Sequence, residues 1–408
     1  MNKSFISLVP AIRMITSSEQ LSTVRLFEKE NINEIVADNG FVKENSINLI
    51  LTEKQSEEDI INNLKDKISE YKANCGINPY YIIINNDIVL MVSPNAFINN
   101  LLEELLISEY DNGNTKNNNE IINEIKNSKK SIENQKVFNK IFIVTGGAQG
   151  FGEGIVKDLF SQGANIVIAD LNSNKGLELA NFLNEKGQLN KVIFQKTDIS
   201  DSKSVEELVN ITVKHFGGID VLISNAGILY AGGLDEMKPE TFELMTKVNY
   251  TGYFICTKYV SAVMRQQSKY SDNYFMDIIQ INSKSGLRGS NKNFAYAGGK
   301  FGGIGLTQSF ALELIPYRIK VNSICPGNFF EGPLWSDPEK GLFVQYLKAG
   351  KVPGAKTIED VKKYYEKQVP ANRGCRIEDV MKAIYYAIDQ EYETGQAIPV
   401  TGGQVMLN

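Results

Sequence analysis

The sequence predicts an α/β protein: a doubly wound parallel sheet of the Rossmann type with about seven strands, preceded by a smaller α/β or α+β domain. Two observations support this prediction. From residue 137 onward, short apolar runs alternate with segments that repeat apolar residues at helical spacing, as in a parallel sheet flanked by helices. The first of these runs, residues 140–147, ends in glycines where a helical pattern begins.

Composition excludes several classes of protein. The 408 residues carry 48 acidic and 43 basic side chains, a formal net charge of −5, so no basic surface for nucleic acid is expected. No apolar run approaches the roughly 18 residues that a membrane-spanning helix needs, and the first residues lack a secretory cleavage pattern. We therefore expect a cytoplasmic protein with neither nucleic acid nor a membrane as a partner.

The cysteine and histidine counts narrow the chemistry. The four cysteines lie far apart without a Cys-x-x-Cys pair, so we expect free thiols at Cys75, Cys256, Cys325 and Cys375. Because His215 is the single histidine, a histidine-rich metal site is excluded. Any Ser-His-Asp or Cys-His arrangement would have to use His215. No metal is predicted, and an acid–base catalyst is expected among other residue types.

The smaller domain, residues 1–110, is predicted from local patterns. Residues 57–71 repeat apolar positions at helical spacing, and residues 80–93 fit two short strands around the turn Asn85-Asn86-Asp87. Residues 111–136 are rich in Asn and Lys and are predicted to be a solvated linker carrying at most one exposed helix. Because no motif with a known mechanism occurs in this domain, we interpret it as a structural or oligomerisation module.

The larger domain, residues 137–408, contains the predicted parallel strands. These are residues 140–147, 165–170, 191–195, 221–224, 276–281, 320–324 and 397–400. Because the carboxyl ends of parallel strands meet at one edge of a sheet, residues that follow these runs are candidates for a common site.

The first strand leads into a candidate dinucleotide site. Its loop is formed by Thr145, Gly146, Gly150, Phe151 and Gly152. Glycines there permit a tight turn and bring a helix N-terminus close to a pyrophosphate. Asp170 ends the next strand about 20 residues further on, where a carboxylate accepts hydrogen bonds from an adenosine ribose. That carboxylate would repel a 2′-phosphate, so NAD is favoured over NADP, with Lys175 as the nearest basic residue.

Two later strand ends add candidate cofactor contacts. Asp198 follows the third strand and suits a contact with the adenine edge, or equally a cap on the following helix. Asn225, Ala226 and Gly227 follow the fourth strand, where they place small residues beside a cofactor or form a turn.

A candidate acid–base group follows the fifth strand. That strand ends at Ser283, and Tyr296 and Lys300 lie four residues apart in a predicted helix, so phenol and ammonium share one face. A free phenol has a pKa of about 10, and a neighbouring cation brings this value toward neutrality. One Tyr-x-x-x-Lys pair is expected by chance among 18 tyrosines, so the pair gains weight only from its surroundings.

Taken in order, the glycine loop, the Asn-Ala-Gly turn, Asn249, Ser283, Tyr296 and Lys300 resemble the short-chain dehydrogenase/reductase family across residues 137–408. The resemblance implies a tetrad in which Tyr296 is the general acid/base and Ser283 orients the reacting oxygen. It implies that Lys300 lowers the pKa of the phenol and holds the nicotinamide ribose, and that Asn249 supports a water-linked proton path. It also implies Pro326 and Gly327 beside the cofactor, and a homo-tetramer or homo-dimer.

Within the family, a closer resemblance is to NAD-dependent dehydrogenases that interconvert a polyol phosphate and a ketose phosphate. It rests on the segments IIQINSKSG, KFGGIGLTQS and TGQAIPVTGGQVM and on Gly374-Cys375. A phosphorylated substrate needs cationic donors; the candidates, each equally explained as a solvated surface charge, are Lys284, Arg288, Lys292 and the more distant Arg376. Residues 329–369, which contain Trp335, are expected to form a lid over the substrate.

Departures from the family pattern leave alternatives open. Gly298 and Gly299 lie inside the catalytic helix, at a cost of about 1 kcal/mol each, and the sequence NFFEG follows Gly327 where many members have a threonine. The alternatives are a dehydrogenase for another polyol or ketose, phosphorylated or not, and a non-catalytic NAD-sensing protein. The first 110 residues resemble the C-terminal part of class II aldolase-type domains, but those bind metal through histidines that this region lacks, so no activity is inferred from them.

Overall fold

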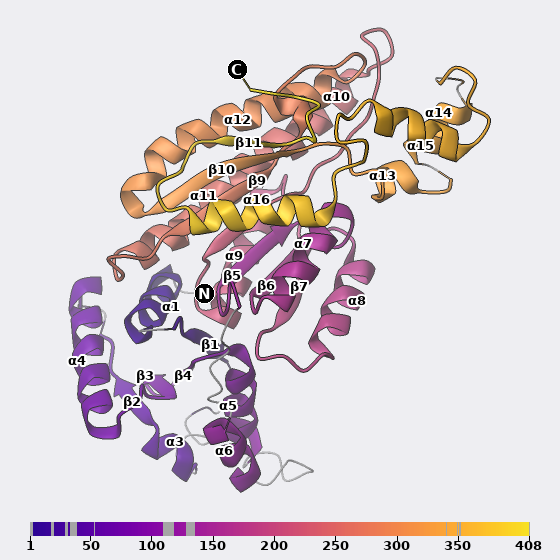
Figure 1. The fold of residues 1–408 in the computed structure, drawn as a ribbon. Helices are drawn as coiled ribbons and strands as arrows, with labels where there is room; N and C mark the ends of the chain where they lie inside the picture. The colour runs from indigo at the N-terminus through magenta and orange to yellow at the C-terminus, as the bar shows by residue number, and fades with distance from the viewer. Residues whose placement is uncertain are drawn as a thin grey trace.

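A computed structural model describes residues 3–17, 20–28, 32, 39–52, 54–108, 118–127, 135–339, 341–348, 350 and 352–407. The larger domain is built on a seven-stranded parallel sheet in the order β11-β10-β9-β8-β5-β6-β7, which confirms the predicted fold class (Figure 1). Its strands are β5 (Ile141–Thr145), β6 (Asn165–Asp170), β7 (Val192–Lys196), β8 (Val221–Ser224), β9 (Met276–Ile281), β10 (Ile319–Pro326) and β11 (Ala397–Val400).

Both faces of this sheet are buried, which explains the continuous apolar runs in the sequence. Alternate residues of β5 belong to different cores: Ile141 and Ile143 to one, Phe142 and Val144 to the other. The first core is covered by α9 (Ser202–Phe216), α11 (Gly252–Ser268) and α12 (Phe294–Leu314). The second is covered by α7 (Gly150–Ser161), α8 (Ser173–Asn184) and α16 (Ile377–Asp389).

The N-terminal domain contains a four-stranded mixed sheet in the order β1-β4-β3-β2. Only the β2–β3 pair is parallel. The strands are β1 (Thr23–Phe27), β2 (Ser46–Leu49), β3 (Tyr81–Ile84) and β4 (Ile88–Ser93). Asn85 and Asn86, both at positive φ, join β3 to β4 as the turn-prone sequence predicted.

Helices cover both faces of the small sheet. They are α1 (Lys3–Thr16), α3 (Gly40–Glu44), α4 (Glu57–Cys75), α5 (Ala96–Ser108) and α6 (Asn118–Asn127). The core of α1 and α4 is continuous with that of the larger domain, so the two domains share one hydrophobic interior. None of the helices in the described ranges combines the length and hydrophobicity needed to cross a bilayer.

The Asn/Lys-rich segment differs from its prediction as an exposed linker. Its helix α6 buries Ile121 and Ile125, four residues apart, against α5. Two apolar residues at helical spacing are therefore enough to anchor an otherwise polar segment. Residues 111–117 and 128–134 lie outside the described residues.

A buried ion pair joins the two domains. The Nη1 and Nη2 atoms of Arg13 on α1 lie 2.8 and 2.7 Å from the two carboxylate oxygens of Asp220, and both side chains are fully buried. Asp220 precedes β8 and also accepts a hydrogen bond from the backbone N–H of Ile141, at 2.7 Å. Burial alone would raise the pKa of Asp220, but the Arg13 guanidinium holds it below its usual value.

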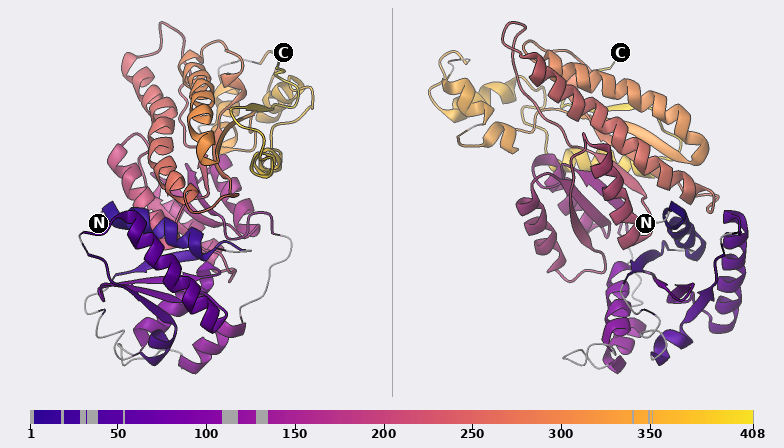
Figure 2. Two further views of the ribbon diagram at one scale, coloured as in Figure 1. Left: turned by 90° about the vertical axis from the view of Figure 1, so that its left-hand side faces the viewer. Right: turned by 180° about the vertical axis from the view of Figure 1, so that it is seen from behind.

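The ion pair continues a row of charges at the amino ends of the strands. Lys320 of β10 lies 3.0 Å from Asp277 of β9, and Asp277 follows Asp220 across the sheet. Burial raises the pKa of Asp277 to about 6 even though Lys320 and Lys140 oppose this shift. The N-terminal domain therefore packs at the amino end of the sheet, away from α13 to α15 at the opposite end (Figures 1 and 2).

We predict that Arg13→Met destabilises the folded chain by about 3–5 kcal/mol, because it leaves the Asp220 carboxylate buried without its partner. Urea denaturation measures this change. Lys157→Met, which breaks the exposed pair between Lys157 and Glu153, is the control and should cost about 1 kcal/mol or less. Adding Asp220→Asn to Arg13→Met should recover part of the lost stability, because it removes the unpaired charge. If Arg13→Met cost no more stability than the control Lys157→Met, the role of the buried pair would be contradicted.

Candidate active site

A cavity of about 870 Å³ opens at the carboxyl ends of β5, β8, β9 and β10. This position is the topological switch point of the sheet. The strands that follow β5 are added on one side of it, as β6 and β7, and the chain then returns to β8 on the other side and continues to β11. The cavity wall includes the candidate residues Gly146, Gly150, Phe151, Asp170, Asn225, Ala226, Gly227, Ser283, Tyr296, Lys300, Pro326 and Gly327. Residues predicted from separate strand ends thus meet in one place.

Ser283, Tyr296 and Lys300 are neighbours in this cavity. Ser283 follows β9, where its hydroxyl accepts a hydrogen bond from the Ser285 N–H at 3.1 Å and pairs with the Tyr296 hydroxyl. Lys300 lies one turn after Tyr296 on α12, with its Nζ 5.6 Å from the centre of the Tyr296 ring. The four-residue spacing in the sequence therefore places both groups on one face, as predicted.

The electrostatics of this group differ from the prediction that Lys300 lowers the pKa of the phenol. Burial raises the pKa of Tyr296, and the hydrogen bond with Ser283 opposes that rise. Burial also lowers the pKa of Lys300 to about 8, and its Nζ donates to the backbone carbonyl of Ile281 at 2.9 Å. Of the groups that shift the pKa of Tyr296, Ser283 is the one that favours the phenolate, and Lys300 is not among them.

Asn249 lies in a five-residue π-helical segment, Lys247–Thr251, between α10 (Pro239–Thr246) and α11. Its side-chain amide is almost completely buried and pairs with the backbone of Ile228 at 2.8 Å in both directions. Irregular helical turns of this kind often occur at functional sites. In this chain, Asn249 fixes the loop after β8 against α11, and Ile228 lines the cavity.

The glycines of α12 have different surroundings. A Cβ atom on Gly299 would lie 3.4 Å from the Asn249 Cβ, and one on Gly302 would lie 2.7 Å from the Tyr250 ring. Close packing against the π-helical segment thus accounts for Gly302, whereas the contact at Gly299 is close to an ordinary van der Waals distance. Gly298 is exposed with open space around it, and nothing in the structure explains it.

The glycine loop has the geometry that a pyrophosphate needs. Gly146 and Gly150 adopt positive φ of 62° and 61°, and a Cβ on Gly152 would lie 2.0 Å from the Gly146 carbonyl oxygen. Gln149, the N-cap residue of α7, makes no side-chain cap hydrogen bond, so its side chain does not satisfy the first N–H groups of this helix. This loop fits a dinucleotide pyrophosphate.

Thr145 and Asn225 connect the glycine loop to the loop after β8. The Thr145 hydroxyl accepts hydrogen bonds from the N–H groups of Asn225 and Ala226 at 3.0 and 3.1 Å. The Asn225 amide donates to the carbonyl oxygens of Thr145 and Gly146 at 3.0 Å. These polar side chains thus hold the two cofactor-facing loops together, a role that the sequence pattern did not reveal.

The two candidate carboxylates lie in different environments. Asp170 lines the cavity, and its oxygens accept hydrogen bonds from the N–H groups of Ala148 at 3.1 Å and Asn172 at 2.9 Å. Asp198 does not line the cavity; its Oδ1 accepts hydrogen bonds from the N–H and hydroxyl of Ser200. Asp198 thus stabilises the turn before α9, while the cap of that helix, the other role considered for Asp198, is Asp201, whose side chain accepts a hydrogen bond from the Lys203 N–H.

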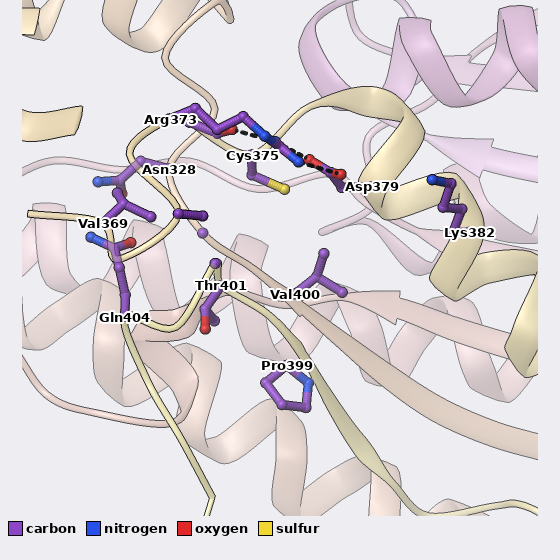
Figure 3. A pocket seen from close by; sticks show the side chains of 14 residues that line it. Asn328, Val369, Arg373, Cys375, Asp379, Lys382, Pro399, Val400, Thr401 and Gln404 are labelled. Carbon is purple, nitrogen blue, oxygen red and sulfur yellow. Dashed lines mark hydrogen bonds and ion pairs between the residues drawn. The ribbon is translucent and has the colours of Figure 1, made fainter. Parts of the chain in front are cut away.

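Three of the four candidate substrate cations line the cavity: Lys284, Arg288 and Lys292. Lys292 is already paired with Glu236 at 3.0 Å. The fourth candidate, Arg376, is exposed at the N-cap of α16 and is not among the residues that line the cavity. Its neighbour Arg373 lines a second cavity of about 270 Å³, where it pairs with Asp379 (Figure 3).

Residues 329–369, the segment predicted to form a lid, contribute to the cavity wall. The described part forms α13 (Pro333–Ser336), α14 (Leu342–Lys348) and α15 (Ile358–Lys367), which pack around the buried Trp335. Phe329 stacks on Phe151 of the glycine loop, with ring centres 4.4 Å apart. The sequence did not single out Tyr346, Tyr365, Gln368 or Gln404, which line the cavity from distant parts of the chain.

Comparison with known proteins agrees with this geometry: the chain belongs to the short-chain dehydrogenase/reductase family, whose short chain dehydrogenase profile matches residues 140–335. It is 36% identical over 272 residues to sorbitol-6-phosphate 2-dehydrogenase of Escherichia coli, covering 66% of this chain and 100% of that protein. It is 34% identical over 273 residues to the 3-oxoacyl-(acyl-carrier-protein) reductase of Chlamydia muridarum, covering 66% and 99%.

Solved structures show the same relationship. The sorbitol-6-phosphate 2-dehydrogenase of Erwinia amylovora is 37% identical, with a TM-score of 0.60 over 65% of this chain and 100% of that one. The 3-ketoacyl-(acyl-carrier-protein) reductase of Brucella melitensis, solved with NADH, shares the fold at 23% identity and a TM-score of 0.55, covering 66% and 99%. By its family, the chain is therefore an oxidoreductase, and its larger domain has the Rossmann-type fold that binds nicotinamide dinucleotides.

We predict that oxidising activity rises with pH, because burial raises the pKa of Tyr296 and oxidation of an alcohol requires its phenolate. Ser283→Ala should lower kcat/KM and move the inflection of the pH profile to higher pH, because a hydrogen bond to a charged group contributes about 1.5–3 kcal/mol, or roughly 10- to 100-fold in rate. Ser290→Ala is the control, since Ser290 lines the cavity but bonds Asn293. An unchanged inflection in Ser283→Ala would contradict the assignment.

Proposed function

We propose that this chain interconverts D-sorbitol 6-phosphate and D-fructose 6-phosphate with NAD by hydride transfer at C2. The observation that carries the proposal is Lys284, a half-buried cation directly after Ser283 in the cavity of Tyr296 and Lys300. The similarity to two sorbitol-6-phosphate 2-dehydrogenases supports the same substrate.

In the proposed reaction, Tyr296 as phenolate takes the proton of the C2 hydroxyl while Ser283 donates a hydrogen bond to the same oxygen. NAD, when bound, accepts the hydride from C2. Lys300 holds the nicotinamide ribose from the floor of the cavity, where Ile281 orients its ammonium. Asn249 supports the chain of polar groups that returns the proton to solvent.

Asp170 is the residue that favours NAD. Its carboxylate faces the cavity and is held by two backbone N–H groups, so a 2′-phosphate there would meet a fixed negative charge. Lys175, which lies 3.4 Å from the Gln149 side chain beside this loop, is the cation that would counter this preference.

The test is NADH formation from a panel of polyol phosphates and free polyols at mildly alkaline pH, with NADP assayed in parallel. We expect the highest kcat/KM with D-sorbitol 6-phosphate and NAD. A higher value with another polyol would favour the second dehydrogenase candidate, and equal values with NADP would remove the NAD assignment. Tight NAD binding without turnover on any substrate would favour the cofactor-sensing alternative.

Lys284→Met and Arg288→Met should each raise KM for D-sorbitol 6-phosphate by about tenfold or more, because a charge-assisted hydrogen bond to phosphate is lost. KM for free sorbitol should change little. Lys292→Met is the matched control, since Lys292 lines the same cavity but is paired with Glu236. Equal effects on both substrates would remove Lys284 and Arg288 from the phosphate site.

A homo-oligomer forms part of the same proposal. Phe301 and Leu312, eleven residues apart on α12, share one helical face and are 47% and 80% exposed. An apolar helical face of this kind suits contact with a second copy. We assign no activity to the N-terminal domain.

A further inference from the structure

Lys284 is a cation without an anionic partner. It lies in the wall of the active-site cavity, where burial lowers its pKa. The hydrogen bond that its Nζ makes is to the neutral Oε1 of Gln404, at 3.3 Å. Among the described residues, no carboxylate pairs with Lys284, so its full charge remains available to a ligand.

Gln404 comes from a structured turn that follows β11. Gly402 and Gly403 adopt positive φ of 60° and 87°, and the Gln404 N–H donates to the Thr401 carbonyl at 3.2 Å. The Thr401 hydroxyl donates to the carbonyl of Val405 at 3.0 Å. These contacts hold the backbone of Gln404 in one place at the end of the sheet.

The turn also contacts the segment where the lid ends. The Ala371 N–H donates to the Gly402 carbonyl at 3.0 Å, and a Cβ on Gly403 would lie 3.0 Å from the Pro370 side chain. Gln404 lines both the active-site cavity and the smaller cavity beside Val369 (Figure 3). It thus lies between the end of the lid, the cofactor residue Gly327 and Lys284.

We propose that Gln404 is a positioning and specificity-determining residue: its neutral amide holds the Lys284 ammonium in the cavity without cancelling its charge, so that Lys284 binds the phosphate monoester of the substrate. The inference rests on the proposed function, because it assigns the phosphate to this site. A carboxylate at position 404 would pair with Lys284 and compete with the phosphate.

Two substitutions separate the charge from the hydrogen bond. Gln404→Glu should raise KM for D-sorbitol 6-phosphate by about tenfold or more, and by a clearly larger factor than it raises KM for free sorbitol. Gln404→Met, which removes the hydrogen bond but leaves Lys284 unpaired, should raise the same KM by only about two- to fourfold. Gln396→Glu is the matched control, because Gln396 is exposed outside the cavity.

A second readout does not depend on the substrate. The rate at which acetic anhydride labels Lys284 near pH 8, followed by mass spectrometry, should fall in Gln404→Glu and not in Gln396→Glu, because an ion pair raises the pKa of the amine. Unchanged labelling and unchanged KM in Gln404→Glu would overturn the inference. If the wild-type protein shows no preference for a phosphorylated substrate, the proposed function fails. The labelling rates still decide whether the side chain at position 404 sets the pKa of the Lys284 amine.

Discussion

The buried pair between Arg13 and Asp220 is the interaction on which the arrangement of the two domains depends. A bidentate ion pair without solvent is stable only when its geometry and its other hydrogen bonds are complete, and Asp220 meets this condition through Ile141. It lies at the amino ends of the strands, so the N-terminal domain packs where the sheet carries no chemistry. The carboxyl ends remain open for the cofactor and substrate.

Desolvation also governs the active site. Burial raises the pKa of Tyr296 and lowers that of Lys300, so each group is moved toward its neutral form. The hydrogen bond with Ser283 opposes the rise in the pKa of Tyr296, and the Lys300 ammonium donates to the Ile281 carbonyl. The same balance leaves Lys284 as a half-buried cation that, among the described residues, bonds the neutral amide of Gln404 and no carboxylate, which makes it suited to an anionic substrate.

Much of the fold and the centre of the site could be predicted from the sequence, because they follow from short-range patterns. A strand end followed by a four-residue spacing was enough to bring Ser283, Tyr296 and Lys300 together. The sequence does not reveal the partners of side chains that have a choice of partner. Asp198 bonds Ser200, Lys292 pairs with Glu236, and Arg376 begins a helix outside the cavity; a sequence pattern gives the charge of such groups but not their nearest neighbour.

By itself, the sequence determined the alternation of strands and helices, the glycine turn and the position of the acid–base residues, since each depends on residues within about one or two turns of one another. Only the tertiary structure decided that α1 supplies the partner of Asp220 and that the turn after β11 reaches Lys284. Arg13 and Asp220 are separated by 207 residues, and Lys284 and Gln404 by 120. Contacts between residues so far apart in the sequence depend on how the whole chain packs, and local sequence patterns do not encode this packing.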